Sequence, residues 1–566
     1  PPPPPPPPPP FFFLTPTTAS AMLRSLVGSE MCIRDSLWSL PTIFEFTRPV
    51  AENREVIWPD GPSERDPTLA NKPNIILILA DDLGFNDVSL YNGGAGDGSL
   101  MTPNMDRIGL EGIKFNNGYA ASASCSPSRA SIMTGRYSTR FGFEFTPAFK
   151  SLITIAKWGE ELNDTGLSII FDDEAELTAL DNDGNIGYPG MPSSEITIPE
   201  VLKNEGYYSA IIGKWHLGTA PSYGPTDQGF DDSLQLMGGL YLPENHPDVV
   251  NARTGEIIDE MVWASTQYAA RNNKSEPFEP RGYITDYYTD EAIKVIEKNK
   301  NRPFFLYLSH FAPHNPLQAL RDDYDHFHHI EGEFSEELKV YSAMLRALDR
   351  SVGRILDTLE KNNLTDNTLI VLTSDNGGAN YIHLSDINKP YRGWKLTHFE
   401  GGLHVPFMAK WPNKIEPGIE FNAPIHANDI LPTFAAAAGA ELPDDRIIDG
   451  VNLLPFLQNH NSDMPHETLY WLQGRLQTVL HKNWKLISDH RTGKDWLFNV
   501  ESDPYERINL ASEMTLKVEE LKRLLNDHKK VQPPPLYDNT MSAPILIDKH
   551  NGYAFQDGDE FTYWDN

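Results

Sequence analysis

Continuous apolar runs recur along the chain, and each one ends at charged or amide side chains. Residues 74–80, 208–212, 304–308 and 367–373 are rich in aliphatic, β-branched and aromatic residues, without a polar residue at every second position. Runs of this kind predict strands that are buried on both faces, as in a parallel sheet covered by helices. The pattern therefore favours an α/β fold.

Amphipathic segments separate these runs. Residues 335–361 carry one apolar stripe at helical spacing, formed by Leu338, Tyr341, Leu345, Leu348, Val352, Ile355 and Leu359. This stripe predicts a long helix that packs on the sheet, rather than a cofactor site. Shorter helices are predicted at 101–112, 197–206 and 289–299, the first two with threonine caps at Thr102 and Thr197.

The pattern changes near residue 458, where short strands replace the alternation of strand and helix. Strands are predicted at 469–472, 476–480, 484–487 and 496–498, followed by a helix to about residue 530. We therefore expect a large domain at 73–457 with a mostly parallel central sheet flanked by helices. A smaller C-terminal domain at 458–530 would hold an antiparallel sheet and a helix, and 531–566 would form a tail.

The first 45 residues do not read as part of this fold. They open with ten prolines, and residues 30–36 resemble a translated sequencing adapter. We expect residues 1–45 to be a non-native leader and exclude them from fold reasoning, which hides any signal peptide. Without Cys32 the chain has one cysteine, Cys125, so cysteine counting does not identify the compartment.

Charge limits the choice of partners. The 566 residues include 47 basic and 79 acidic side chains, for a formal net charge of −32. Such a surface repels nucleic acid and anionic membranes, and no run is long enough to span a bilayer, so we expect neither partner. A polyanionic ligand would need a pocket with its own positive charge.

Candidate chemistry gathers where the apolar runs end. Asp81 and Asp82 follow the first run, Lys214 and His216 the second, His314 the third, and Asp375 and Asn376 the last. Each could be an ordinary cap or a packed side chain, but the carboxyl ends of parallel strands meet at one edge of a sheet. Two pairs of oxygen ligands there predict calcium or magnesium rather than zinc. His310 and His314 have the spacing of a helical zinc pair, which Pro313 and Pro316 argue against.

Cys125 begins the most specific motif, Cys-x-Pro-Ser-Arg-x-x-x-x-Thr-Gly-Arg, which ends at Arg136. Read alone, Cys125 is a small buried residue or a thiol at a helix N-terminus. The motif resembles the signature of the type I sulfatases. Further blocks around Lys214, His314 and Lys395 follow in the same order, and the resemblance spans about residues 73 to 512.

The resemblance implies an alkaline-phosphatase-like fold and hydrolysis of a sulfate monoester, expected on a carbohydrate. A formylglycine-generating enzyme would oxidise Cys125 to formylglycine, whose hydrate is the nucleophile. One Ca²⁺ would be held by Asp81, Asp82, Cys125, Asp375 and Asn376. The remaining catalytic residues would be Arg129 at the hydrate, Lys214, His314 and Lys395 at the sulfate, and His216 as a base. His314 or Lys395 would protonate the leaving alcohol, and family members suggest a periplasmic or secreted location.

Two features depart from the family pattern. His404 occupies the position where arginine is usual, which questions the support of Lys395, and the acidic stretch 147–190 resembles an insertion. The insertion could shape access to the site or be a solvated loop. Two other functions stay open: a phosphoester or phosphonate ester hydrolase with the same metal and modified cysteine, and a silent binding protein in which Cys125 is never converted.

Overall fold

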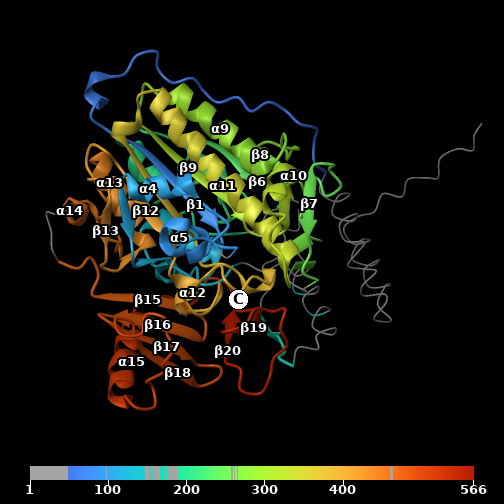
Figure 1. Ribbon diagram of the computed structural model, residues 1–566. Helices are drawn as coiled ribbons and strands as arrows, with labels where there is room; N and C mark the ends of the chain where they lie inside the picture. Colours follow the sequence, from blue (N-terminus) through green and yellow to red (C-terminus); the bar gives the residue numbers. More distant parts are fainter. Residues whose placement is uncertain are drawn as a thin grey trace, which may run out of the picture.

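A computed structural model gives the fold. It describes residues 49–566 except 97, 147–152, 154–156, 158–165, 173, 176–188, 256–258, 261, 264–265 and 459–462. The expected leader, including Cys32, lies outside the described residues, and so does most of the expected insertion. Figure 1 shows a large body of helices around a central sheet, with a smaller sheet at one end.

The central sheet has nine strands within the described residues, in the order β13-β2-β12-β11-β1-β9-β5-β6-β8. Its middle is a parallel block formed by β11 (Thr368–Ser374), β1 (Asn74–Asp81), β9 (Phe304–Pro313) and β5 (Tyr208–Gly213). Parallel pairs also join β5 to β6 and β13 to β2, while β12 and β8 run antiparallel to their neighbours. The outer strands are β6 (Asp232–Leu236), β8 (Ala270–Asn272), β12 (Phe407–Lys410), β2 (Ile113–Phe115) and β13 (Ile419–Phe421). The sheet is therefore mostly parallel, as predicted.

Both faces of β1 are covered, which explains its unbroken apolar sequence. Ile76 and Ile78 pack in the cluster that contains α9 (Ile284–Asn299) and α11 (Ser335–Lys361). Ile75 and Leu77 pack on the other face in a cluster with the helices α5 (Cys125–Thr134), α7 (Ile198–Lys203) and α13 (Ile430–Ala438). Other helices and short strands of the large body are α3 (Ser89–Asn92), α4 (Pro103–Leu110), α10 (Arg321–Tyr324), α12 (Glu400–Leu403), α14 (Leu454–Leu457), β3 (Gly118–Tyr119), β7 (Val249–Ala252), β10 (Leu317–Leu320) and β14 (Ile425–His426).

Two element boundaries differ from the prediction. Helix α9 begins at Ile284, five residues before the predicted start, because the first turns bury Tyr288 in the core. Strand β9 continues to Pro313 instead of ending at residue 308. His310 is fully buried within it, and its Nε2 atom lies 2.8 Å from the Ser351 hydroxyl of α11. The hydrogen bond to another element lets the strand continue through this polar residue.

The smaller C-terminal sheet is antiparallel, as predicted, with the strands β15 (Thr468–Gln473), β16 (Leu476–His481), β17 (Trp484–Asp489) and β18 (Lys494–Asn499). Helix α15 (Thr515–Lys529) packs its apolar face on this sheet. The tail then forms β19 (Met541–Leu546) and β20 (Phe561–Asp565), which pair with each other and with β4 (Ile170–Phe171). The domain limits at 73, 457 and 530 stay predictions.

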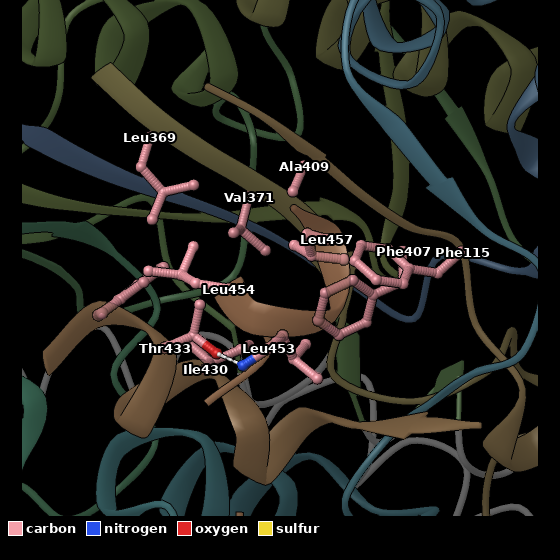
Figure 2. A pocket seen from close by; sticks show the side chains of 11 residues that line it. Phe115, Leu369, Val371, Phe407, Ala409, Ile430, Thr433, Leu453, Leu454 and Leu457 are labelled. Atoms are coloured by element: carbon pink, nitrogen blue, oxygen red, sulfur yellow. Dashed lines mark hydrogen bonds between the residues drawn. The ribbon is translucent and has the colours of Figure 1, made fainter. Parts of the chain in front are cut away.

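An apolar cavity of about 20 Å³ lies between the sheet and helices α13 and α14 (Figure 2). Phe115, Val371 and Leu457 are among its lining side chains, and none of the lining residues is charged. It is a packing gap in the core, and we assign it no catalytic or binding role. Among the described residues, no helix is both long and apolar enough to cross a membrane.

Candidate active site

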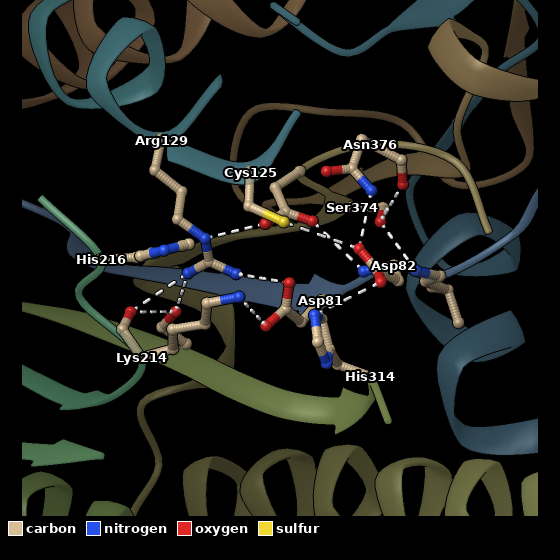
Figure 3. A network of polar contacts seen from close by, with 12 residues as sticks. Asp81, Asp82, Cys125, Arg129, Lys214, His216, His314, Ser374 and Asn376 are labelled. Atoms are coloured by element: carbon tan, nitrogen blue, oxygen red, sulfur yellow. Dashed lines mark hydrogen bonds and ion pairs between the residues drawn. The ribbon is translucent and has the colours of Figure 1, made fainter. Parts of the chain in front are cut away.

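Four parallel strands place polar side chains at one edge of the central sheet. Asp81 is the last residue of β1, and Asp375, Lys214 and His314 directly follow β11, β5 and β9. Because β11, β1, β9 and β5 are neighbours, these four side chains converge. Figure 3 shows Asp81, Lys214 and His314 close together. Asp82, at a positive φ of 61°, bends the chain away from the sheet and directs its carboxylate to the same place.

Cys125 is the first residue of helix α5 and is buried against the carboxylates. Its Sγ atom lies 3.7 Å from Oδ1 of Asp82. Burial raises the pKa of the Cys125 thiol far above its usual range, although Lys214 and Lys395 oppose the rise. An unmodified Cys125 is therefore a protonated thiol at neutral pH, which is a poor nucleophile.

Arg129 lies one turn further along α5 and is completely buried. Its Nε donates to Oδ2 of Asp375 at 2.8 Å, and its Nη1 donates to the Ser309 hydroxyl at 2.6 Å. Its Nη2 lies 3.4 Å from Oδ1 of Asp81. Burial raises the pKa of Asp375 to about 7, and the guanidinium opposes that rise. Arg129 thus serves as the counter-ion for two strand-end carboxylates.

Two lysines neutralise the aspartates at the end of β1, Asp81 and Asp82. Lys214 Nζ lies 2.5 Å from Oδ2 of Asp81, and Lys395 Nζ lies 2.7 Å from Oδ2 of Asp82. Burial alone would raise the pKa of Asp81, but Lys214 and Arg129 outweigh it and hold the pKa well below its usual range. Both aspartates are therefore ionised.

The two predicted histidines are partly buried and neutral. Burial lowers the pKa of His314 to about 4, with Asp82 opposing, and burial lowers the pKa of His216 well below its usual range, helped by Lys214. His314 Nδ1 lies 2.6 Å from the carbonyl oxygen of Asn315, which can only accept. The hydrogen of the neutral His314 ring is thus on Nδ1, and Nε2 offers a lone pair to Lys395 at 3.4 Å.

Sequence reasoning missed Tyr381, Ser309 and Ser374. The Tyr381 hydroxyl lies 3.1 Å from Lys395 Nζ and 3.3 Å from Oδ2 of Asp82. Ser309 binds Arg129, and the Ser374 hydroxyl accepts from the backbone N–H of Leu83. Ser374 is the last residue of β11, beside the predicted Asp375, and could have been found there. Ser309 lies inside β9, and no spacing marks Tyr381.

His404, the departure from the family pattern, does not enter the site. It is buried between two acceptors. Its Nδ1 atom lies 2.8 Å from Oε2 of Glu400, and its Nε2 atom lies 2.8 Å from the carbonyl oxygen of Asn116. Glu400 also binds Lys485 of β17 at 2.6 Å, and Lys485 binds Glu506 at 2.8 Å. His404 thus joins a buried charge network between the two domains, while Lys395 keeps its own partners.

The residues present fit a hard divalent cation. Oδ1 of Asn376 is buried without a hydrogen-bond partner, and the two oxygens of Asp81 are held by ion pairs with Lys214 and Arg129 alone. Ligand atoms of Asp81, Asp82, Cys125 and His314 lie within 4.8 Å of one another. This group differs from the predicted ligands, because the carboxylate of Asp375 is engaged by Arg129 and by the Asp82 backbone N–H at 3.2 Å. A cluster of ionised carboxylates and an amide oxygen suits Ca²⁺ or Mg²⁺.

Comparison with known proteins agrees with this geometry. The family model for sulfatases matches residues 73–440, and that for the C-terminal part of N-sulphoglucosamine sulphohydrolase matches residues 393–531. N-acetylgalactosamine-6-sulfatase of Homo sapiens is 33% identical over 400 residues, which cover 69% of this chain and 67% of that protein. Steryl-sulfatase of Homo sapiens is 30% identical over 473 residues, which cover 72% and 73%.

Solved structures place the fold with the same enzymes. The crystal structure of Ps i-CgsB is 30% identical with a TM-score of 0.67, and the match covers 82% of this chain and 94% of that one. The same values hold for its complex with k-i-k-neocarrahexaose. The family-wide match and the convergent strand-end residues agree: the chain belongs to the sulfatase family, whose members hydrolyse sulfuric esters.

Proposed function

We propose that this sulfatase hydrolyses a sulfate monoester on a sulfated carbohydrate, with a nucleophile made by oxidation of Cys125. The observation that carries the proposal is the position of Cys125, buried at a helix N-terminus and 3.7 Å from an ionised aspartate. The thiol there stays protonated. A conversion that replaces it would therefore be required before the residue could attack sulfur.

Formylglycine at position 125 would add water to give a geminal diol, and one of its hydroxyls would be the nucleophile. Loss of the proton from the second hydroxyl would re-form the carbonyl as the bond to the sulfate breaks. A Ca²⁺ ion held by Asp81, Asp82, residue 125, Asp375 and Asn376 would supply positive charge for the sulfate oxygens. The unpartnered Oδ1 of Asn376 and the buried, ionised carboxylate of Asp81 support this set. A formylglycine-generating enzyme would be the maturation partner, and a periplasmic or secreted location would follow the family.

Lys214 and Lys395 would bind the oxygens of the sulfate. Their ammonium groups pair with Asp81 and Asp82, respectively. The hydrogen-bond pattern favours Lys395 over His314 as the donor of the proton to the leaving alcohol, because Nε2 of His314 faces Lys395 as an acceptor. His216, which is neutral and whose Nδ1 is buried without a hydrogen-bond partner, would act as the base.

The substrate class follows from the relatives. One relative is named for a sulfated amino sugar, and a similar structure was solved in complex with k-i-k-neocarrahexaose. A saccharide sulfate carries one charge on a poor leaving group, which requires both the cationic groups and the proton donor. The acidic surface of the chain opposes long polyanions, so binding depends on the local charge of the site.

The mass of the tryptic peptide of residues 115–129 tests the nucleophile. After expression in a host that has the maturation enzyme, the Cys125 peptide should lose the mass that separates CH₂–SH from CHO. Cys125→Ala, expressed in parallel, provides the unconverted reference. Converted protein should then release sulfate from sulfated sugars. An intact thiol, in a host that converts a control sulfatase, would refute the proposal and favour a silent binder.

Rates on matched aryl esters test the chemistry. The converted protein should hydrolyse 4-nitrophenyl sulfate faster than 4-nitrophenyl phosphate or a 4-nitrophenyl phosphonate, because the leaving group is the same in all three. Faster hydrolysis of the phosphate or the phosphonate would refute the proposal and identify a phosphoester or phosphonate ester hydrolase.

A further inference from the structure

Tyr381 occupies a position in the site that the proposed mechanism leaves unexplained. It lies in the short helical turn η7 (Asn380–Ile382), and its side chain is almost completely buried. Its hydroxyl lies 3.1 Å from Lys395 Nζ and 3.3 Å from Oδ2 of Asp82. The single phenolic hydrogen can be donated to the carboxylate, which leaves the oxygen to accept from the ammonium.

The Lys395 ammonium therefore has one acceptor for each of its three hydrogens. These acceptors are Oδ2 of Asp82 at 2.7 Å, the Tyr381 oxygen at 3.1 Å and Nε2 of His314 at 3.4 Å. Three acceptors in fixed positions define the direction of a group that is otherwise free to rotate. Tyr381 is the one of the three that is neither charged nor a proposed ligand or sulfate contact.

The C-terminal tail, defined as residues 531–566, holds the turn that carries Tyr381. Asn380 Nδ2 donates to Oδ1 of Asn551 at 2.7 Å, and the backbone N–H of Asn551 donates to the carbonyl of Asn380 at 3.2 Å. The ring of His550 stacks on that of His383, with the centroids 5.4 Å apart. The tail thus contacts the turn on both sides of Tyr381.

The same tail holds the loop that carries Lys395. Arg392 forms a bidentate pair with Asp548, in which both N–O distances are 2.7 Å, and it also pairs with Glu560. The loops that carry Tyr381 and Lys395 also contact each other, because the backbone N–H of Lys395 donates to the carbonyl of Gly378 at 3.0 Å. The family model for the C-terminal part ends at residue 531, so these tail contacts lie beyond it.

We propose that Tyr381 is a positioning residue that directs the Lys395 ammonium at the leaving group, and that the C-terminal tail fixes Tyr381 in place. The inference rests on the proposed sulfate hydrolysis. Its signature is dependence on the leaving group, since a misdirected proton donor matters most when the departing oxygen needs a proton. A purely structural role would slow all esters equally.

The experiment compares Tyr381→Phe with wild type on phenyl sulfate and on 4-nitrophenyl sulfate, whose leaving group needs little protonation. We expect kcat to fall about 10- to 100-fold on phenyl sulfate and less than about threefold on 4-nitrophenyl sulfate, with KM within about twofold. Tyr207→Phe is the matched control. Its buried hydroxyl donates to Pro73 at the opposite end of the sheet at 2.7 Å, and its loss should change neither rate.

Asn551→Ala tests the tail, with Lys549→Ala as its control. Lys549 lies in the same tail but pairs with Asp559 rather than with either loop. Asn551→Ala should reproduce the leaving-group dependence of Tyr381→Phe at smaller size, and Lys549→Ala should not. Equal losses on both esters in Tyr381→Phe, or no loss, would overturn the role of Tyr381. A normal Asn551→Ala enzyme would overturn the role of the tail.

Failure of the proposed function gives a different result. If converted wild-type protein hydrolysed neither ester, sulfate hydrolysis itself would be refuted before any variant was compared. If the wild type is active, only the ratio of the two kcat losses decides whether Tyr381 directs Lys395.

Discussion

Replacing Arg129 by alanine should destabilise the catalytic domain as well as abolish activity. The guanidinium is fully buried and contacts Asp375 at 2.8 Å and Asp81 at 3.4 Å. Removal leaves two buried carboxylates with a reduced counter-charge, and it also leaves the Ser309 hydroxyl without its arginine partner. The variant therefore tests whether Arg129 is part of the fold or acts only on the reacting group.

The expected size follows from the contacts. Breaking a fully buried ion pair by removing one partner costs about 3–5 kcal/mol, because the remaining charge stays buried. Lys214 still neutralises Asp81, so the loss falls mainly on Asp375. An exposed pair gives the contrast: Lys530→Ala, which breaks a pair with Asp527 at 2.7 Å on the surface, should cost less than about 1 kcal/mol.

Urea unfolding followed by tryptophan fluorescence and circular dichroism measures both variants. Arg129→Ala should unfold at clearly lower urea than wild type, and adding Asp375→Asn should recover part of the loss because the unpaired charge is gone. Arg129→Ala within about 1 kcal/mol of wild type would refute the counter-ion role. So would a double variant whose loss is the sum of the two single losses.

Three further outcomes are expected. The free energy of unfolding should fall as the pH drops below about 6, because burial lowers the pKa of His310 to about 3 and only the unfolded chain takes up the proton. At pH 5 this protonation should lower the free energy of unfolding by about 2 kcal/mol. If the free energy of unfolding of His310→Gln depends on pH as steeply as that of wild type, the prediction is wrong. Chelator should lower the thermal midpoint and Ca²⁺ restore it, whereas Asp81→Asn should not respond; a calcium response in that variant would exclude Asp81 as a ligand. His404→Ala should cost about 1–3 kcal/mol in urea unfolding, because it removes a buried hydrogen-bonded ring from between Glu400 and the Asn116 carbonyl. Wild-type stability would contradict this.

Most of the fold was predictable because its signals are local. An unbroken apolar run reports a strand covered on both faces, and the stripe of 335–361 reports helix α11 residue for residue. The start of α9 and the end of β9 were wrong because Tyr288 and His310 are polar-bearing residues that the core accepts. Local polarity does not reveal a partner on another element.

The site divides in the same way. Strand-end residues such as Asp81 and Lys214 could be placed together from sequence, because parallel strands fix where their carboxyl ends lie. Tyr381 could not, since its position depends on contacts such as that between Asn380 and Asn551, which are 171 residues apart. The predicted leader and most of the predicted insertion lie outside the described residues, and the catalytic roles stay predictions.

Charge balance explains why the site folds before it can bind an anion. The three carboxylates at the sheet edge are matched by three fixed cations, and the histidines are neutral: Asp81, Asp82 and Asp375 against Arg129, Lys214 and Lys395. This balance keeps the buried charges compatible with a stable core, but it leaves no surplus to attract a sulfate ester to a protein of charge −32. A divalent cation among the carboxylates would add the missing charge where the lysines now lie. The proposed cation ligands and the two lysines therefore depend on each other. The lysines stabilise the fold by pairing with Asp81 and Asp82, the same aspartates that would hold the cation.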